Sequence, residues 1–389
     1  MDKIGKKQLV ALFFSSLVGW TILQSILNLL PLYAVQVGAG RALAGNFLAL
    51  VFVAITLGTL SAGWASDKYQ RRKSMLILAG LLNIPVTWLM GQVIEFWQMA
   101  VLTFIVYFLI GFSFTTIGIL AGLFSGASER GKVFGILAIN SSLGALIGGA
   151  VSGPIVDRWG FPALFLLTAS CWVLQPLIAL LLQDRVLAEL PREAESIQTE
   201  NRAFGGTFYL FMLANLIAFG ASFIAVLGRP LRMDELHFDA AAISGVVAIG
   251  GAVSLPLPFL FGWLSDRMNR YWLIVSCFLV SAIGLAALAR SLALWHFGFS
   301  TILLSGVGIS LGIGPALVTD LVPPKNLGRA LSLYNFSPSM GGIFSFGLAG
   351  YAFQGFGMYA TFMGGAFLTL IAVALVVWVQ RAQAKVNHL

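Results

Sequence analysis

The chain has 389 residues, of which 59% are hydrophobic and only 10% are charged, and its formal net charge is +8. Because soluble proteins carry about 25% charged residues, this composition excludes a water-soluble globular protein and predicts one that spans a membrane. The positive charge does not indicate nucleic-acid binding. The cations lie between long apolar segments, which is the pattern that the positive-inside rule describes for membrane proteins.

Long apolar runs follow one another along the whole chain. A spanning helix needs about 20 apolar residues, whereas a barrel strand needs about ten. Backbone polar groups in lipid must be paired within a helix or a closed barrel, and these runs are too long for strands, so each predicts a helix. The twelve runs cover residues 9–37, 43–66, 74–95, 97–126, 133–156, 162–183, 204–229, 240–264, 271–290, 292–320, 329–353 and 357–380.

The distribution of cations predicts the orientation. If the N-terminus lies in the cytoplasm and the helices alternate in direction, the inner segments hold 18 of the 23 Lys and Arg residues. Cytoplasmic loops carry the excess of Lys and Arg, so both termini are expected in the cytoplasm, in a multi-pass protein of the cell inner (plasma) membrane. The remaining cations fall in outer segments and are Arg41, Arg158, Arg229, Arg232 and Arg290.

The longest polar stretch, residues 184–203, divides the predicted helices into two sets of six. We predict an N-terminal six-helix bundle over residues 1–183, a cytoplasmic linker over residues 184–203 and a C-terminal six-helix bundle over residues 204–389.

The two halves repeat short motifs at a nearly constant offset. Gly63-Trp64-Ala65-Ser66-Asp67-Lys68 is echoed 199 positions later by Gly262-Trp263-Leu264-Ser265-Asp266-Arg267. Two further pairs are offset by 197: Glu129-Arg130-Gly131-Lys132 with Asn326-Leu327-Gly328-Arg329, and Gly160-Phe161-Pro162 with Gly357-Met358-Tyr359. Parallel six-helix repeats are one known plan of secondary transporters, in which the substrate site lies at the midplane between the repeats.

These motifs resemble those of the major facilitator superfamily, and the resemblance covers nearly the whole chain. The first motif, with Arg71 and Arg72 after it, is similar to the family's signature loop between helices 2 and 3, although Gln70 stands where glycine is usual. Its echo lies between helices 8 and 9, as in the family. The resemblance implies an all-α integral membrane protein with twelve transmembrane helices in two six-helix pseudo-repeat bundles. It also implies a secondary transporter that works by rocker-switch alternating access.

Helix 5 resembles the drug-efflux branches of the family. Gly135, Gly144 and Gly148 keep the spacing of the antiporter motif, although Gly149 stands where that motif has proline. Helix 4 has Tyr107 where the drug–proton antiporters have arginine. Export of small hydrophobic or amphipathic compounds is therefore the leading interpretation. An uncoupled or uptake carrier of a neutral solute, a lipid or lysolipid flippase, and a membrane receptor that transports nothing stay open.

The signature loop predicts a cytoplasmic gate. A carboxylate at Asp67 can face the positive N-terminus of a neighbouring helix, and the resemblance places the start of helix 11, near Gly328-Arg329, opposite it. Arg130 is a second candidate partner. A contact that forms only when this side closes would favour the outward-facing state, although topology alone would also explain the loop cations. The predicted gate residues are Gly63, Asp67, Lys68, Arg71, Arg72, Arg130, Gly262, Asp266, Arg267 and Arg329.

The predicted cavity contains no carboxylate, because no Asp or Glu lies near the middle of an apolar run. Proton-coupled carriers usually keep an intramembrane acid as a relay, so the cavity should suit neutral, apolar or amphipathic molecules. Trp20, Gln24 and Asn28 recur at one helical face. The full set of predicted substrate-binding residues is Trp20, Gln24, Asn28, Tyr107, Asn140, Asn215, Phe219, Ser222 and Asn335. Interhelical hydrogen bonding, worth about 0.6 kcal/mol in lipid, is the alternative role for each.

Catalysis is not expected, because the sequence shows no nucleophile constellation, metal-ligand cluster or cofactor motif. The segment 126–132 matches part of a phosphate-loop pattern, but Val133 follows it in place of Ser or Thr and no strand precedes it. We therefore expect no enzyme activity, metal or cofactor. The expected partners of a monomeric protein are a small-molecule substrate, membrane lipids and, if transport is coupled, a proton or another ion, but no nucleic acid.

Overall fold

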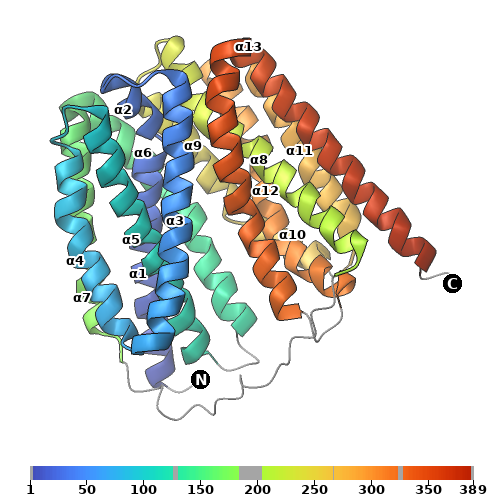
Figure 1. Cartoon of the computed structure of the whole chain (residues 1–389), viewed down its shortest axis with the longest axis horizontal. Coiled ribbons are helices and arrows are strands. Elements are labelled where there is room, and N and C mark those ends of the chain that lie inside the picture. The colour runs from blue at the N-terminus through green and yellow to red at the C-terminus, as the bar shows by residue number, and fades with distance from the viewer. Residues whose placement is uncertain (1–2, 126–129, 184–203, 266, 323–326, 387–389) are drawn as a thin grey trace. The chain divides into compact units, whose positions relative to one another are not determined.

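The computed structural model describes residues 3–125, 130–183, 204–265, 267–322 and 327–386 (Figure 1). Within these ranges every regular element is a helix. The helices are α1 (Lys3–Leu27), α2 (Leu30–Gln36), α3 (Arg41–Tyr69), α4 (Arg72–Met90), α5 (Phe96–Phe124), α6 (Arg130–Trp172), α7 (Leu174–Leu180), α8 (Gly206–Glu235), α9 (Ala240–Ser254), α10 (Leu257–Ser265), α11 (Arg270–Ala289), α12 (Leu294–Leu321) and α13 (Leu327–Val386). The predicted linker over residues 184–203 lies outside the described residues.

The prediction of twelve transmembrane helices is confirmed. In the described ranges, 9 helical segments are long and apolar enough to cross a membrane. Two of them, one that runs through α6 and α7 and one within α13, each hold two predicted spans that meet at a non-helical glycine. The remaining span consists of α9 and α10, which are separated by a two-residue turn at residues 255–256. The protein is therefore an all-α integral membrane protein with twelve transmembrane helices in two pseudo-repeats.

The two glycines that separate these spans confirm the sequence repeat in the backbone itself. Gly160 has φ 76° and ψ 176°, and Gly357 has φ 78° and ψ 171°. This region of backbone conformation is essentially restricted to glycine, because it lacks a Cβ. Gly160 and Gly357 are the first residues of two motifs that lie 197 positions apart. The same turn therefore occurs once in each repeat.

The first predicted helix is divided into two, which corrects the placement of Asn28. The helix α1 ends at Leu27, and Asn28 lies in the turn before α2 rather than on the same helix as Trp20 and Gln24. Pro31 explains the break, because it has no amide N–H for the carbonyl of Leu27 and its ring would clash with that carbonyl in a continuous helix. The Asn28 side chain also donates to the Gln24 carbonyl oxygen at 2.7 Å.

The described chain forms two compact units. Unit 1 comprises Met1–Gly38, Leu50–Asn201 and Asp239–Gly251, and unit 2 comprises Ala39–Ala49, Arg202–Phe238 and Ala252–Leu389. Each unit therefore contains a short segment from the other half of the sequence: nearly all of α9 belongs to unit 1, and the start of α3 belongs to unit 2. The predicted division of the chain at residues 184–203 stays a prediction.

Close helix packing inside unit 1 depends on small residues. A Cβ on Gly58 of α3 would lie 2.0 Å from the Phe108 carbonyl oxygen of α5, and a Cβ on Gly111 of α5 would lie 2.3 Å from the Ile55 carbonyl oxygen. Small residues let the backbones of membrane helices approach in this way. The core of unit 2 also contains stacked aromatic rings, with those of Phe211 and Tyr334 6.0 Å apart.

Arg229 adds a buried cation to the predicted charge map. The sequence places it in an outer segment, which stays a prediction; α8 continues to Glu235, and Arg229 is only 7% exposed. Its guanidinium donates to Thr301 Oγ1 of α12 at 3.0 Å. The described acids do lie near helix ends or the kink at Gly160, as predicted. The interior of unit 2 therefore contains a buried cation that hydropathy alone did not reveal.

Candidate functional site

A partly exposed polar and aromatic surface lies on α1 in unit 1. The Trp20 ring stacks on Phe114 of α5, with ring centroids 4.9 Å apart and an interplanar angle of 24°. One turn further along α1, Gln24 Oε1 accepts a hydrogen bond from Asn28 Nδ2 at 3.3 Å. An aromatic pair beside a side-chain amide offers an apolar face and a polar anchor, which is the usual composition of a small-molecule site.

Sequence reasoning missed Phe114. The segment is rich in aromatic residues, so nothing in its composition distinguished this one. Its spacing did carry a signal, because Phe114 lies seven residues after the predicted site residue Tyr107, which places both on one face of α5. The surface formed by Trp20, Gln24 and Phe114 is called the α1 site below.

The other predicted site residues of unit 1 are fully buried. Asn140 of α6 donates through Nδ2 to the Phe13 carbonyl oxygen of α1 at 3.0 Å, which is the interhelical hydrogen bond that the sequence left open as its alternative role. The Tyr107 hydroxyl has no hydrogen-bond partner within the described residues. A ligand role for either residue stays a prediction.

Unit 2 holds the remaining predicted substrate-binding residues. The Asn215 side chain of α8 donates to Ser337 Oγ of α13, and both side chains are buried. Phe219 is buried, and the Ser222 hydroxyl donates to the Phe219 carbonyl oxygen at 2.8 Å within α8. Asn335 is exposed. Their roles as ligands stay predictions, and the contact made by Asn215 favours a helix-joining role for that residue.

In unit 1 the start of α9 packs backbone to backbone on α6. The Gly153 amide donates to Ser244 Oγ at 3.1 Å. A Cβ on Gly153 would lie 2.1 Å from the Ala240 carbonyl oxygen, and a Cβ on Gly149 would lie 2.7 Å from the Ser244 carbonyl oxygen. The two helices can approach this closely only because glycine occupies both positions.

Two carboxylates bind the N-terminus of α9. Asp157 of α6 accepts hydrogen bonds from the backbone amides of Ala240 at 2.9 Å and Ala241 at 2.8 Å, one on each carboxylate oxygen. Asp239 accepts from the Ala242 amide at 2.7 Å. The first amides of a helix have no partner within the helix and carry the positive end of its dipole. Asp157 therefore attaches α9 to α6 through charge as well as through hydrogen bonds.

In unit 2 the start of α3 packs on α13 in a related way. A Cβ on Gly45 would lie 2.5 Å from the Phe346 carbonyl oxygen, and one on Gly350 would lie 3.0 Å from the Gly45 Cα. The Asn46 side chain donates to Tyr351 Oη at 3.0 Å. Gly153 and Gly350 differ by the repeat offset of 197. The contacts of α9 with α6 and of α3 with α13, called the exchange contacts below, are therefore equivalent in the two repeats.

A charged cluster accompanies the second exchange contact. Arg41, the first residue of α3, forms an ion pair with Glu235 at the end of α8, and Arg232 pairs with the same carboxylate at 3.1 Å. All three side chains are partly exposed, so each pair contributes at most about 1 kcal/mol.

The glycines of α6 pack against two different helices, α1 and α9. A Cβ on Gly144 would lie 2.7 Å from the Trp20 carbonyl carbon, and a Cβ on Gly148 would lie 2.7 Å from the Thr21 carbonyl oxygen, so these two glycines pack on α1. Gly149 and Gly153 pack on α9. Gly135 has open space where its side chain would be. Two glycines of the spacing that resembles the antiporter motif, Gly144 and Gly148, therefore let α6 pack closely on α1. Gly149 and Gly153 let it pack on α9 in the exchange contact.

The signature loop and its echo share one arrangement. Lys68 Nζ lies over the Trp64 ring at 4.7 Å, and the Arg267 guanidinium lies over the Trp263 ring at 4.0 Å. Both tryptophans are exposed, and the cation follows the tryptophan by four residues in each repeat. Exposed Trp next to a cation is typical of a helix end at a membrane interface.

The structure gives side-chain contacts for some of the other predicted gate residues and only the exposure of others. Arg72 donates through Nε to Ser66 Oγ at 2.5 Å, and the Arg329 guanidinium lies 5.3 Å from the centroid of the Phe204 ring. Gly63 is partly exposed, and Asp67 and Arg71 are exposed. Gly262 lies within α10, whereas Asp266 and the side chain of Arg130 lie outside what the structure describes. The gate itself stays a prediction.

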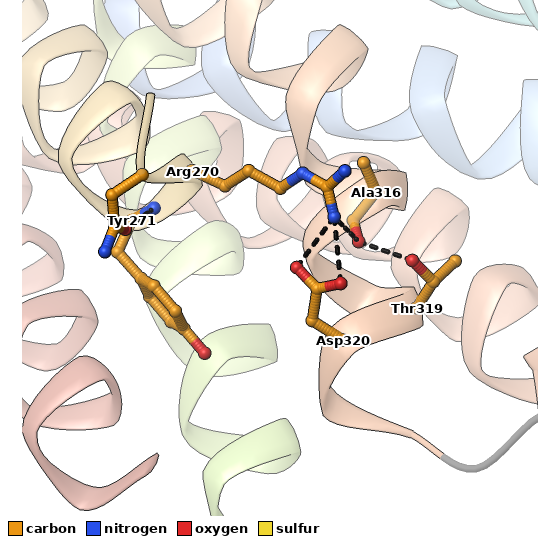
Figure 2. A network of polar contacts seen from close by, with 6 residues as sticks. Arg270, Tyr271, Ala316, Thr319 and Asp320 are labelled. Carbon is orange, nitrogen blue, oxygen red and sulfur yellow. Dashed lines mark hydrogen bonds and ion pairs between the residues drawn. The ribbon is translucent and has the colours of Figure 1, made fainter. Parts of the chain in front are cut away.

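An ion pair that the sequence analysis did not predict joins α11 to α12 (Figure 2). The Arg270 guanidinium donates to both carboxylate oxygens of Asp320 at 2.8 Å and to the Ala316 carbonyl oxygen at 3.3 Å. Arg270 follows the echo motif and lies 199 positions after Arg71, which was the signal available in the sequence. The pair fixes the start of α11 to the end of α12 inside unit 2.

Comparison with known proteins shows similarity along the whole chain. The model of the Major Facilitator Superfamily matches residues 9–208 and 203–388. The chain is 25% identical over 247 residues to Sugar efflux transporter A of Dickeya chrysanthemi, a match that covers 62% of each protein. It is 24% identical over 361 residues to Multidrug resistance protein MdtG of Proteus mirabilis, a match that covers 88% of this chain and 85% of that protein.

Solved structures with the same fold also cover nearly all of the chain. The inward-facing, unoccupied structure of a bacterial homolog of the human lysosomal transporter Spinster has a TM-score of 0.78 at 14% identity, covering 99% of this chain and 98% of that one. A POT family transporter in complex with a thioalcohol-conjugated peptide has a TM-score of 0.79 at 13% identity, covering 97% and 96%. At such identities the similarity establishes the fold alone.

Proposed function

Since the chain belongs to the Major Facilitator Superfamily and is a membrane transporter, we propose that it exports small hydrophobic or amphipathic compounds by rocker-switch alternating access. The names of the relatives in sugar efflux and multidrug resistance support export as the direction. The composition of the α1 site supports the class of substrate.

The exchange contacts are the observation that carries the mechanism. Each joins a helix of one repeat to a helix of the other, and each includes glycine backbone contacts and a hydrogen bond. A contact that is present in only one state shifts the population toward that state, so we expect both exchange contacts to form and break together in each transport cycle.

The α1 site supports an uncharged or amphipathic substrate. Trp20 and Phe114 offer aromatic faces, Gln24 offers an amide, and no described Asp or Glu lies in the middle of a spanning helix. A cationic substrate would therefore find no carboxylate there, and an intramembrane acid of the kind that usually relays protons is missing from the described spans.

Transport of a hydrophobic fluorescent dye by the purified protein in proteoliposomes tests the proposed function. We expect the dye to move faster than in empty liposomes. Comparing an imposed proton gradient with none then shows whether transport is coupled. If the dye does not move under either condition, the protein does not export this class of compound.

Trp20→Ala is expected to raise the KM for the dye about two- to tenfold, because an aromatic stacking contact contributes about 0.5–1.5 kcal/mol. Trp97→Ala is the matched control, since Trp97 is exposed at the start of α5 and its indole binds Glu95. An equal rise in KM for both variants would contradict a binding role for Trp20.

A further inference from the structure

A groove runs along the outside of unit 1 between α1 and α7. Its volume is about 650 Å³, within the range of about 300–1,000 Å³ that is usual for ligand pockets. Its wall is apolar and consists of Val10, Ala11, Phe14, Leu17, Val18, Leu174, Ile178 and Leu181. Val10, Phe14, Leu174 and Leu181 remain exposed in the chain itself. A hydrocarbon chain can lie along this wall.

One end of the groove is cationic. Lys6 and Lys7 are exposed there, and neither ammonium group makes a hydrogen bond or ion pair within the described residues. No described Asp or Glu lines the groove. Two cations next to an apolar wall at a membrane surface match the charge and shape of an anionic lipid head group above its acyl chain.

The same end of the groove is held rigid by a buried side chain. Gln8 is 4% exposed; its amide nitrogen donates to the Leu181 carbonyl oxygen at 3.1 Å, and its amide oxygen accepts from the Gln183 backbone amide at 2.9 Å. These bonds fix α1 to the end of α7 and satisfy the polar groups of Gln8. The two lysines are therefore the donors that remain for a ligand.

A second groove, in unit 2, has no such charge. It has a volume of about 520 Å³ and lies between α8 and α13 in unit 2. Its lining includes Phe344, Leu348, Phe356 and Phe367, and it contains no charged residue. That groove offers a wall for a hydrocarbon chain but nothing for an anionic head group.

We propose that the groove between α1 and α7 binds an anionic phospholipid, with an acyl chain on the apolar wall and the phosphate between Lys6 and Lys7. The site lies on the lipid-facing surface and does not depend on the transported compound.

Native mass spectrometry of the full chain tests this site. Phosphatidylglycerol and phosphatidylcholine with the same acyl chains are added separately, and we expect the anionic lipid to bind more tightly. Lys6→Gln with Lys7→Gln should weaken phosphatidylglycerol binding by about tenfold or more, because each cation near an anionic lipid surface contributes on the order of a fivefold gain. Val10→Trp should weaken it without changing the charge, by filling the groove.

The matched control is Arg381→Gln with Lys385→Gln, which removes two cations from positions that do not line the groove. It should leave binding unchanged. A rise in melting temperature on adding phosphatidylglycerol, seen for the wild type and lost in the lysine variant, shows that the variant is folded and lacks only the site. Equal binding of the two lipids, or equal losses in both double variants, would overturn the proposal and leave the proposed export function untouched.

Discussion

Gly153→Ala is expected to reduce transport about fivefold to a hundredfold while the protein still inserts and folds. The added Cβ would lie 2.1 Å from the Ala240 carbonyl oxygen and 2.2 Å from Ser244 Oγ, so the start of α9 must move away from α6. Forcing an extra carbon into a closely packed contact costs about 1–3 kcal/mol, and each 1.4 kcal/mol changes an equilibrium tenfold. The state that contains the exchange contact would lose that amount of stability.

Gly135→Ala is the matched control, because it makes the same change in the same helix where a Cβ meets nothing within 4 Å. Initial dye transport is measured in proteoliposomes that contain equal amounts of each variant, and folding is checked from the melting temperature. If the Gly153→Ala and Gly135→Ala variants transported dye at the same initial rate, close packing of α6 on α9 would not be needed for transport.

Asp157→Lys is expected to reduce transport by about tenfold. The substitution replaces a carboxylate that accepts from the Ala240 and Ala241 amides by a cation at the positive end of α9. A favourable charge at a helix terminus is worth about 0.3–1 kcal/mol and up to about 2 kcal/mol in a partly buried setting, and the reversal both removes this gain and adds a repulsion. Asp157→Asn, which keeps one acceptor, should have a smaller effect.

Asp234→Lys makes the same change in charge at an exposed acid near the end of α8 and serves as the control. Raising the salt concentration should not restore Asp157→Lys, because screening weakens the repulsion but does not return the lost hydrogen bonds. Equal rates for the two lysine variants would show that Asp157 acts only through net charge, and the role proposed for it would be wrong.

The fold could be predicted from the sequence because the bilayer imposes one rule on every segment. Apolar length predicted the twelve spans, and the motif pair at Gly160 and Gly357 predicted the repeat that the backbone confirms. Breaks inside spans were harder to predict. Pro31 explains one such break, but hydropathy is averaged over many residues and did not show that α1 ends before Asn28.

The site was less predictable because burial and partnership depend on neighbouring helices. Asn140 and Asn215 stay predicted substrate-binding residues, and the sequence did not show that each joins two helices through its side-chain amide. The burial of Arg229 was not predicted, because its sequence neighbours gave no sign that Thr301 would accept from it. Asp157 received no role, since the helix end that it binds comes from 83 residues further along the chain. Its role becomes visible only when α6 and α9 are seen in contact.

The central claim is that the exchange contacts open in every transport cycle, and a reversible cross-link across one of them tests it most directly. In a chain whose Cys171 and Cys277 are replaced by alanine, Asp157→Cys and Ala241→Cys introduce thiols at two residues that are now joined by a carboxylate-to-backbone-amide hydrogen bond of 2.8 Å. A short thiol cross-linker joins them, and intact mass measures the yield. We predict that the cross-linked protein does not transport dye and that reduction restores the rate of the untreated double variant. If the cross-linked protein transported dye as fast as it does after the cross-link is cleaved by reduction, the claim would be contradicted.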